Sequence, residues 1–263
     1  MGLLTIEQIT EKSMKKEMDL PSQIEKYKDT VDMHNVASSL WFDNVNISIS
    51  HIKTEKFLQA KIRFYNCAWL DEYCMSVRNN RFLDYGLHHA SYAVLSDNEP
   101  LIQRYAKLRY QRGANAELSM DEMVAIGELP IWCNTVQFFM ANDNAGVERN
   151  LNIIETKTLP KLPKKEEGLK DDYEFYKALH TGDKAKMEEI LEKLVSPKIH
   201  KKRNDNPILN QYISLPALGY AKLAWRQGIE VEINTPLIPK EILPIQPLDH
   251  YEIPYDFLKG QPF

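Results

Sequence analysis

Residues 54–78, TEKFLQAKIRFYNCAWLDEYCMSVR, carry the strongest helical pattern in this 263-residue chain. Their apolar side chains recur at helical spacing, but they cover more than one face of the helix. The apolar set is Phe57, Leu58, Ile62, Phe64, Tyr65, Ala68, Trp69, Tyr73, Met75 and Val77. A helix that is apolar on two sides is normally packed between neighbours. This stretch therefore predicts a helix enclosed by other helices.

The stretches on either side are also helical in pattern. Thr5 with Gln8, and Ser119 with Glu122, have the spacing of a capping box, which marks the start of a helix. A proline inside a helical pattern predicts an end or a kink. The helices expected in the first half cover residues 5–21, 32–51, 81–96 and 100–112, with breaks at 79–80 and 113–115, followed by a helix from residue 119 that Pro130 kinks or splits.

The second half begins with residues 158–168, TLPKLPKKEEG, a Pro- and Lys-rich segment that is the one candidate for a sub-boundary. It is too short to establish two domains, so a single domain over residues 1–263 is expected. Residues 171–180 and 184–195 predict a helical hairpin around Gly182, of the kind that stacks on its neighbours in helical-repeat proteins. An exposed basic loop is expected at 196–206, and a last helix at 209–227.

The chain from Gly228 onward is not helical in pattern. Gly228 ends the last helix, and residues 229–233, IEVEI, alternate strictly and predict a short extended segment. Six prolines in residues 236–263 predict a tail that covers the helices. Only 10 residues are glycine, about half the average share, which argues against turn-rich sheets and Gly-rich phosphate loops. The expected fold class is all-α: stacked antiparallel helices with a short extended segment and a Pro-rich C-terminal tail.

Composition also bears on the compartment and the partners. The N-terminus lacks the basic and apolar segments of a signal peptide, and no stretch approaches 18 uncharged apolar residues. Cys67, Cys74 and Cys133 are an odd number of thiols in apolar helical patterns, which predicts buried, reduced cysteines. A cytoplasmic protein without a membrane partner is expected. The net charge of -4 gives no electrostatic reason for direct nucleic-acid binding.

Motifs for catalysis or cofactor binding, such as a Walker loop, HExxH or GxSxG, are absent from the sequence. No catalytic residue, cofactor or metal ligand is therefore assigned. Asp84 and His88 have the helical spacing of a carboxylate–imidazole pair, either catalytic or a surface hydrogen bond. The adjacent acids at 71–72 and at 171–172 point apart on a helix and are expected to be solvated. The basic run at 200–203 is expected to lie in the exposed loop.

Charge is distributed unevenly along the chain. Residues 113–156 carry seven carboxylates and a single cation, Arg149, whereas residues 157–204 are net +4. Two of the acids follow Ser119 in the first turn of a helix, where they complement the helix dipole. The others form either an ordinary solvated face or an acidic surface for a basic partner such as a nuclease. The candidate partner-binding residues are Glu117, Asp121, Glu122, Glu128, Asp143 and Glu148.

One stretch resembles a known family. In residues 215–244, LPALGYAKLAWRQGIEVEINTPLIPKEILP, a helix rich in small residues leads into a Pro-rich segment. The small residues are Ala217, Gly219, Ala221 and Ala224, and the segment carries Arg226, Gly228, Ile229, Val231, Ile233, Pro236, Leu237, Ile238, Pro239, Leu243 and Pro244. This pattern is similar to the C-terminal signature of the family-49 immunity proteins of bacterial polymorphic-toxin systems. At residues 234–235, Asn-Thr stands where the family more commonly has an acidic residue and a serine.

The resemblance implies a mostly helical, cytoplasmic protein that neutralises a cognate toxin by direct binding, and it brings no catalytic residues. The resulting hypothesis is an immunity protein that occludes the active site or substrate groove of a toxin domain. The signature residues have clear structural uses, so they are expected to serve the fold rather than toxin contact. Two alternatives stay open: a helical-repeat adaptor for another protein, and an enzyme with an all-α active site around Asp84 and His88.

Overall fold

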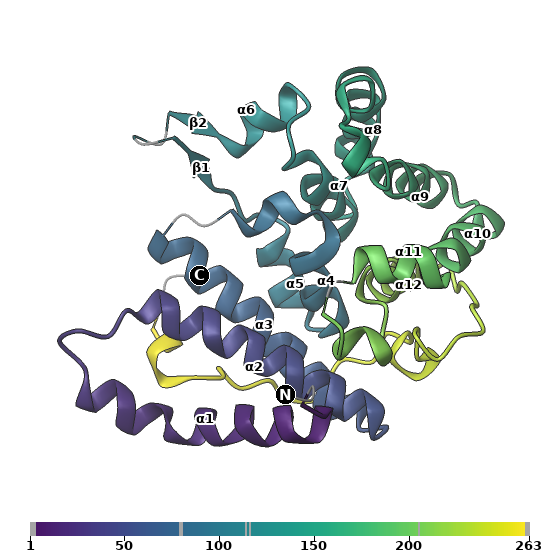
Figure 1. Cartoon of the computed structure of the whole chain (residues 1–263). Helices are drawn as coiled ribbons and strands as arrows, with labels where there is room; N and C mark the ends of the chain where they lie inside the picture. Colours follow the sequence, from purple (N-terminus) through teal and green to yellow (C-terminus); the bar gives the residue numbers. More distant parts are fainter. Residues whose placement is uncertain (1–3, 79–80, 114, 116, 205, 261–263) are drawn as a thin grey trace.

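The computed structural model describes residues 4–78, 81–113, 115, 117–204 and 206–260 (Figure 1). Within these residues the α-helices are α1 Ile6–Lys26, α2 Met33–Lys53, α3 Phe57–Arg78, α4 Leu87–Leu95, α5 Glu99–Tyr105, α6 Met120–Ala125, α7 Ile131–Met140, α8 Asn144–Ile153, α9 Leu169–Thr181, α10 Lys184–Val195, α11 Pro197–Arg203 and α12 Leu215–Arg226. The strands β1 Gln111–Arg112 and β2 Leu118–Ser119 form one antiparallel pair. The all-α prediction is confirmed.

Short helical turns connect the longer elements. They are the 3-10 turns η1 Phe82–Tyr85, η3 Leu159–Lys161, η4 Lys164–Glu166, η5 Leu209–Gln211, η6 Lys240–Ile242 and η7 Asp256–Leu258, and the π-helical turn η2 Ile154–Thr158. The predicted linker at 158–168 is therefore built from η3, η4 and the last residue of η2. The predicted break at residues 79–80 lies outside the described residues.

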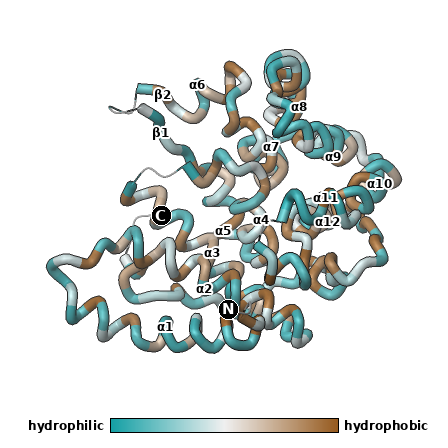
Figure 2. Tube along the Cα trace, viewed as in Figure 1, coloured by the Kyte–Doolittle hydropathy of each residue, from teal (hydrophilic) through white to brown (hydrophobic). Residues whose placement is uncertain are grey.

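Helix α3 is enclosed as the sequence predicts, and it begins at Phe57, three residues later than expected. It packs most extensively on α2 and also contacts α4 and α5, while α1 lies on the outer side of α2 (Figure 1). Helix α1 is hydrophilic along most of its length (Figure 2). Only Ile6, Ser13 and Leu20 of α1 are buried, so α1 is an outer helix.

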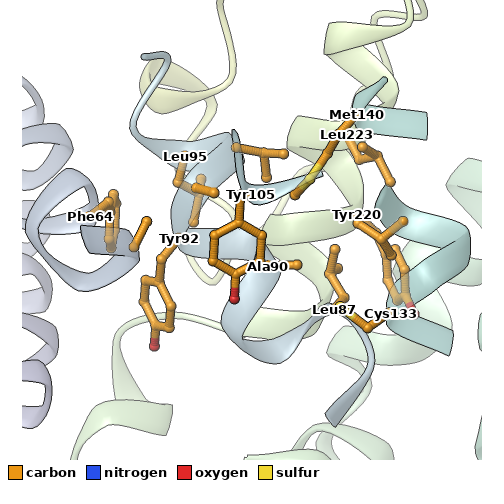
Figure 3. Packing of buried hydrophobic residues seen from close by; sticks show 14 of the residues in the cluster. Phe64, Leu87, Ala90, Tyr92, Leu95, Tyr105, Cys133, Met140, Tyr220 and Leu223 are labelled. Atoms are coloured by element: carbon orange, nitrogen blue, oxygen red, sulfur yellow. The ribbon is translucent and has the colours of Figure 1, made fainter. Parts of the chain in front are cut away.

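The centre of the core lies around α4 (Figure 3). Side chains from α3, α5, α7 and α12 converge on it; those labelled in the figure are Phe64, Leu87, Ala90, Tyr92, Leu95, Tyr105, Cys133, Met140, Tyr220 and Leu223. Helix α12 approaches α4 closely at Gly219, where an added Cβ would lie 2.7 Å from the Cβ of Ser91. The small residues of the signature therefore serve close helix packing, as predicted.

The helix boundaries expected near Pro21 and across Gly86 differ from the prediction. Pro21 does not end α1, which continues to Lys26. An interior proline costs a helix about 3 kcal/mol, but Leu20 is buried next to it and the packing of α1 on α2 holds the turn. The helix expected at 81–96 is broken at Gly86, whose φ of 60° is left-handed and separates η1 from α4. The split at Pro130 is confirmed, because α6 and α7 lie on either side of it.

The helix expected at 100–112 ends earlier, at Tyr105. Residues 111–112 belong instead to β1, which pairs with β2 in the register Gln111 to Ser119 and Arg112 to Leu118. The capping box of Ser119 and Glu122 at the start of α6 is confirmed. The capping box, a signal within three residues, was therefore reliable here, whereas the strand pairing depends on residues six to eight positions apart.

The second half contains a confirmed hairpin and two corrections. Helices α9 and α10 pack on each other across Gly182, whose φ is 73°. The predicted exposed loop at 196–206 is wrong, since residues 197–203 form α11 and His200 is buried. The predicted helix at 209–227 begins only at Leu215, because Pro216 lacks an N–H and is suited to a first turn. The extended segment at 229–233 pairs with no strand among the described residues, but Val231 is buried.

The Pro-rich tail returns across the molecule from α12 to the layer of α1, α2 and α3 (Figure 1). It contributes Ile238, Ile242, Leu243 and Leu258 to the buried core. The prediction of a tail that covers the helices is confirmed.

Candidate functional site

All six predicted partner-binding carboxylates are exposed: Glu117, Asp121, Glu122, Glu128, Asp143 and Glu148. They come from the β-hairpin, from α6 and the turn after it, and from the start of α8. Helices α6 and α8 lie at the same end of the molecule as it is viewed in Figure 1. The sequence therefore placed these side chains correctly in solvent.

Four of the six carboxylates already have local partners. Asp121 lies 2.8 Å from Arg109 Nε, and Glu122 accepts a hydrogen bond of 2.8 Å from the N–H of Ser119. Asp143 caps α8 by accepting from Gly146, and Glu117 accepts from the N–H of Asn115 in the hairpin turn. These contacts stabilise the local structure, whether or not a partner is bound.

Glu128 and Glu148 differ from the other four. Neither side chain makes a hydrogen bond or an ion pair within the part of the chain that the structure describes. Glu128 lies in the turn between α6 and α7, and Glu148 lies on the outer face of α8. Of the predicted site residues, these two are the most available to a partner.

The predicted pairing of Asp84 with His88 is wrong. The left-handed turn at Gly86 places Asp84 on η1 and His88 on α4, so the two do not share one helix. Asp84 accepts hydrogen bonds from the Tyr110 hydroxyl and, at 2.8 Å, from Arg112. An all-α active site built on this pair is therefore not what the fold forms.

The predicted solvation of Asp71 and Glu72 is also wrong, because both side chains have no exposed surface. Glu72 accepts two hydrogen bonds from Arg104, and burial raises the pKa of Glu72 to about 7. Asp71 faces His89 on α4, with its two oxygens 2.9 and 3.1 Å from His89 Nδ1. The acids of α3 are buried because this helix has neighbours on several sides.

Asp172 is a further acid that the sequence misplaced in solvent. It is buried, lies 2.7 Å from Arg203 of α11 and accepts a hydrogen bond from the Tyr220 hydroxyl of α12. Asp171 behaves more as expected, because it pairs with Lys193 near the surface. The ion pair of Asp172 with Arg203 helps to explain why 197–203 is a packed helix rather than a loop.

His89 is held on both faces by aromatic rings. Trp41 stacks on it with ring centres 4.5 Å apart, and Phe82 stacks at 4.4 Å. The Tyr105 hydroxyl donates to Asp71 at 3.2 Å and so steadies the carboxylate that holds Nδ1. His89 is only 8% exposed, and its orientation is fixed by these contacts.

His89 lies in the wall of a pocket of about 700 Å³ between α2, η1, α4 and the α11–α12 region. We call it the aromatic pocket. Its walls include Trp41, Phe82, His88, His89 and Tyr92, and its other side is formed by Lys202, Arg203, Asn204, Asn206 and Asn210. Its volume falls within the range of ligand-binding sites in proteins.

His88 sits in the same wall, with an exposed edge. Desolvation by the walls and the neighbouring His89 ring lower the pKa of His88, which keeps it neutral near pH 7. The aromatic pocket therefore offers flat apolar surfaces and two imidazole groups on one side, with amides and cations on the other.

A second hollow of about 820 Å³ lies between α1, α3 and the tail. Glu17 in its wall is 2.7 Å from Arg63 and accepts a hydrogen bond from the Tyr255 hydroxyl. These contacts fasten the tail to α1 and α3, so the polar groups of this hollow serve the fold.

A closed cluster of charges fixes the other end of the tail. Asp97 lies 2.6 Å from Lys61 and 2.7 Å from Lys222, and all three side chains are at most 1% exposed. Lys222 also donates to the carbonyls of Ile242, Leu243 and Pro244 at 2.9 to 3.1 Å. Burial lowers the pKa of Lys222 to about 8.

Comparison with known proteins decides the family. The family described as Immunity protein 49 matches residues 48–242. The chain belongs to this family. No curated protein and no solved structure matches the chain.

As an Immunity protein 49 member, the chain shares more with the family than the signature at 215–244, because the match begins within α2. The signature serves the fold through a residue that the sequence analysis overlooked. Lys222 lies on the signature helix and binds the carbonyls of residues 242–244, where the signature ends. The sequence did carry a sign of this role. Lys222 is a lysine among the small and apolar residues of α12, where its charge is shielded from solvent and needs a partner.

Two further features are absent from the part of the chain that the structure describes. No group of three His, Cys, Asp or Glu side chains in this part of the chain is arranged to hold a metal ion. No helix in it combines the length and the apolar character needed to cross a bilayer. Cys67, Cys74 and Cys133 are buried free thiols, as predicted.

Proposed function

We propose that this immunity-family protein binds a cognate toxin domain and neutralises it by occluding the active site or substrate groove. The observation that carries the proposal is the family match over residues 48–242. Occlusion needs only a rigid complementary surface, and the enclosed helices and the fastened tail supply rigidity.

We further propose that the exposed acidic residues of 113–156 face a basic surface of the toxin, such as that of a nuclease. Acidic side chains in place of phosphate speed association and favour a basic partner. Glu128 and Glu148 are the best residues for a test, because no described residue pairs with them. Glu117, Asp121, Glu122 and Asp143 share the surface but also hold local structure.

The proposal is tested by co-expression with the toxin encoded beside this protein. Wild-type protein is expected to restore growth and to co-purify with the toxin domain. Failure of both would overturn the proposed function. A genomic neighbour unrelated to toxins would instead favour the adaptor alternative.

The acidic surface has a separate test. The double variant Glu128→Lys/Glu148→Lys is expected to slow association with the toxin at least about tenfold at low salt, with a smaller effect at high salt. The control is Glu11→Lys/Glu192→Lys, which makes the same change in net charge at two exposed acids on α1 and α10. Equal association rates for the two double variants would contradict the acidic surface.

A further inference from the structure

Asp71 orients one polar side chain in the wall of the aromatic pocket, that of His89. In the tautomer in which His89 Nδ1 donates to Asp71, the neutral ring has its lone pair on Nε2. His89 lines the pocket, and no hydrogen bond joins Nε2 to a described residue. In this tautomer Nε2 is an acceptor for a hydrogen bond from an occupant of the pocket.

The walls around this acceptor select a flat group. Trp41 presents its ring beside His89, and Tyr92 meets Trp41 edge to face with ring centres 5.1 Å apart. Aromatic walls favour an aromatic occupant, which gains from stacked and edge-to-face contacts in addition to burial. An aromatic group that also donates a hydrogen bond is a phenol or an indole, as in Tyr and Trp.

The mouth of the pocket favours a macromolecule over a small molecule. Phe42 and Tyr85 line the pocket and are 63% and 65% exposed. Large exposed aromatic side chains at the rim of a pocket are typical of protein interaction surfaces, and a small ligand held inside does not cover them.

The positive charge at the rim of the pocket favours a partner that has an acidic residue next to its aromatic side chain. Lys202 is exposed and makes no ion pair within the described residues, whereas Arg203 is neutralised by Asp172. No carboxylate is among the described residues that line the pocket. A carboxylate of the partner therefore meets a complementary charge here.

We propose that the aromatic pocket receives a Tyr or Trp side chain of the toxin, which donates a hydrogen bond to His89 Nε2, while an adjacent toxin carboxylate faces Lys202. The inference rests on the proposed function, and it names the chemistry of one contact. It is independent of the acidic surface, which lies on other elements and favours basic residues of the toxin.

The first test uses the full-length protein and the purified toxin domain in an equilibrium binding assay. The double variant Phe42→Ala/Tyr85→Ala changes only exposed rim residues and is expected to weaken binding about 30-fold or more. The control Met18→Ala/Tyr27→Ala removes two exposed apolar side chains of the α1 region and is expected to leave affinity unchanged.

The outcomes separate the two proposals. Absence of binding by wild-type protein would overturn the proposed function. Tight binding by wild-type protein and by the rim variant alike would overturn the pocket contact and leave the proposed function standing. A third outcome is saturable binding of adenosine monophosphate in the pocket together with a toxin affinity that the rim variant does not change. This outcome would overturn the pocket contact and indicate a small-molecule site.

The hydrogen bond to His89 is tested by a double-mutant cycle. His89→Phe keeps a ring between Trp41 and Phe82 but removes the acceptor. Each surface Tyr of the toxin is changed to Phe and each surface Trp to 1-naphthylalanine, which removes the donor and keeps an aromatic ring. One of these changes is expected to weaken binding to wild-type protein several-fold and to have no further effect on His89→Phe. Additive losses at every aromatic position would overturn the hydrogen bond. Circular dichroism and urea unfolding verify that His89→Phe is folded.

Discussion

Asp97 and Asp71 are both buried carboxylates in the helical core, yet their surroundings differ. Asp97 is enclosed by Lys61 and Lys222, and these lysines also bind the tail carbonyls, so every member of the cluster is shut off from solvent. Asp71 instead holds His89, whose outer edge reaches the aromatic pocket. The closed charge cluster fixes the chain in place, whereas the open one orients a side chain in the wall of the aromatic pocket.

The physical difference lies in what each carboxylate neutralises. Two lysines without solvent depend on one aspartate, and a buried charge without its partner is strongly unfavourable. Asp71 faces a single imidazole ring, that of His89, which lines the aromatic pocket, so its loss leaves no enclosed lysine without a counter-charge. Stability is therefore expected to depend far more on Asp97 than on Asp71.

The largest effect is expected for Asp97→Asn. The substitution removes the counter-charge of Lys61 and Lys222 and is expected to lower the free energy of unfolding by about 3–5 kcal/mol. Asn readily adopts the left-handed backbone that Asp97 has, with φ of 57°, so the loss reports charge rather than strain. Urea unfolding measures the loss, and limited proteolysis is expected to cleave the loosened tail. A loss below about 1 kcal/mol would contradict a closed structural cluster.

An intermediate effect is expected in the pH dependence of Lys222→Met. Lys222 titrates at about 8 in the folded protein, below its ordinary 10.5, so between these values the unfolded chain binds more protons at this site. The contribution of Lys222 to the free energy of unfolding therefore increases as pH rises from 8 to 10.5, by up to about 3 kcal/mol. Urea unfolding of both proteins across this range measures it as a growing difference. A difference that stays constant would contradict the lowered pKa of Lys222.

The smallest effect on stability is expected for Asp71→Asn. The amide oxygen still accepts from His89 Nδ1, so the loss in the free energy of unfolding is expected to be about 1–2 kcal/mol. The same urea titration measures it beside Asp97→Asn. If Asp71→Asn destabilises the protein as much as Asp97→Asn does, the distinction between an open and a closed cluster fails. Toxin affinity is expected to fall several-fold, because the orientation of His89 is less firmly held.

The sequence predicted those features that depend on neighbouring residues. The capping boxes at Thr5 and Ser119, the split at Pro130 and the hairpin turn at Gly182 each follow from residues within a few positions of one another. It also placed the carboxylates of 113–156 in solvent, because a helix dense in acids on a polar face has no core to join. The family resemblance at 215–244 pointed to the family that the longer match establishes.

The sequence alone determined an all-α chain with its principal helices, its small-residue contact at Gly219 and its proline-rich covering tail, because periodicity, caps and proline act locally. Only the tertiary structure decided which buried charges meet. Asp97 and Lys222 are 125 residues apart, and Asp71 and His89 lie on different helices, so their pairing depends on how α3, α4 and α12 rotate as they pack. A buried charge needs a hydrogen-bond partner or a counter-charge. For these carboxylates another helix supplies it, so spacing along one helix does not reveal their roles.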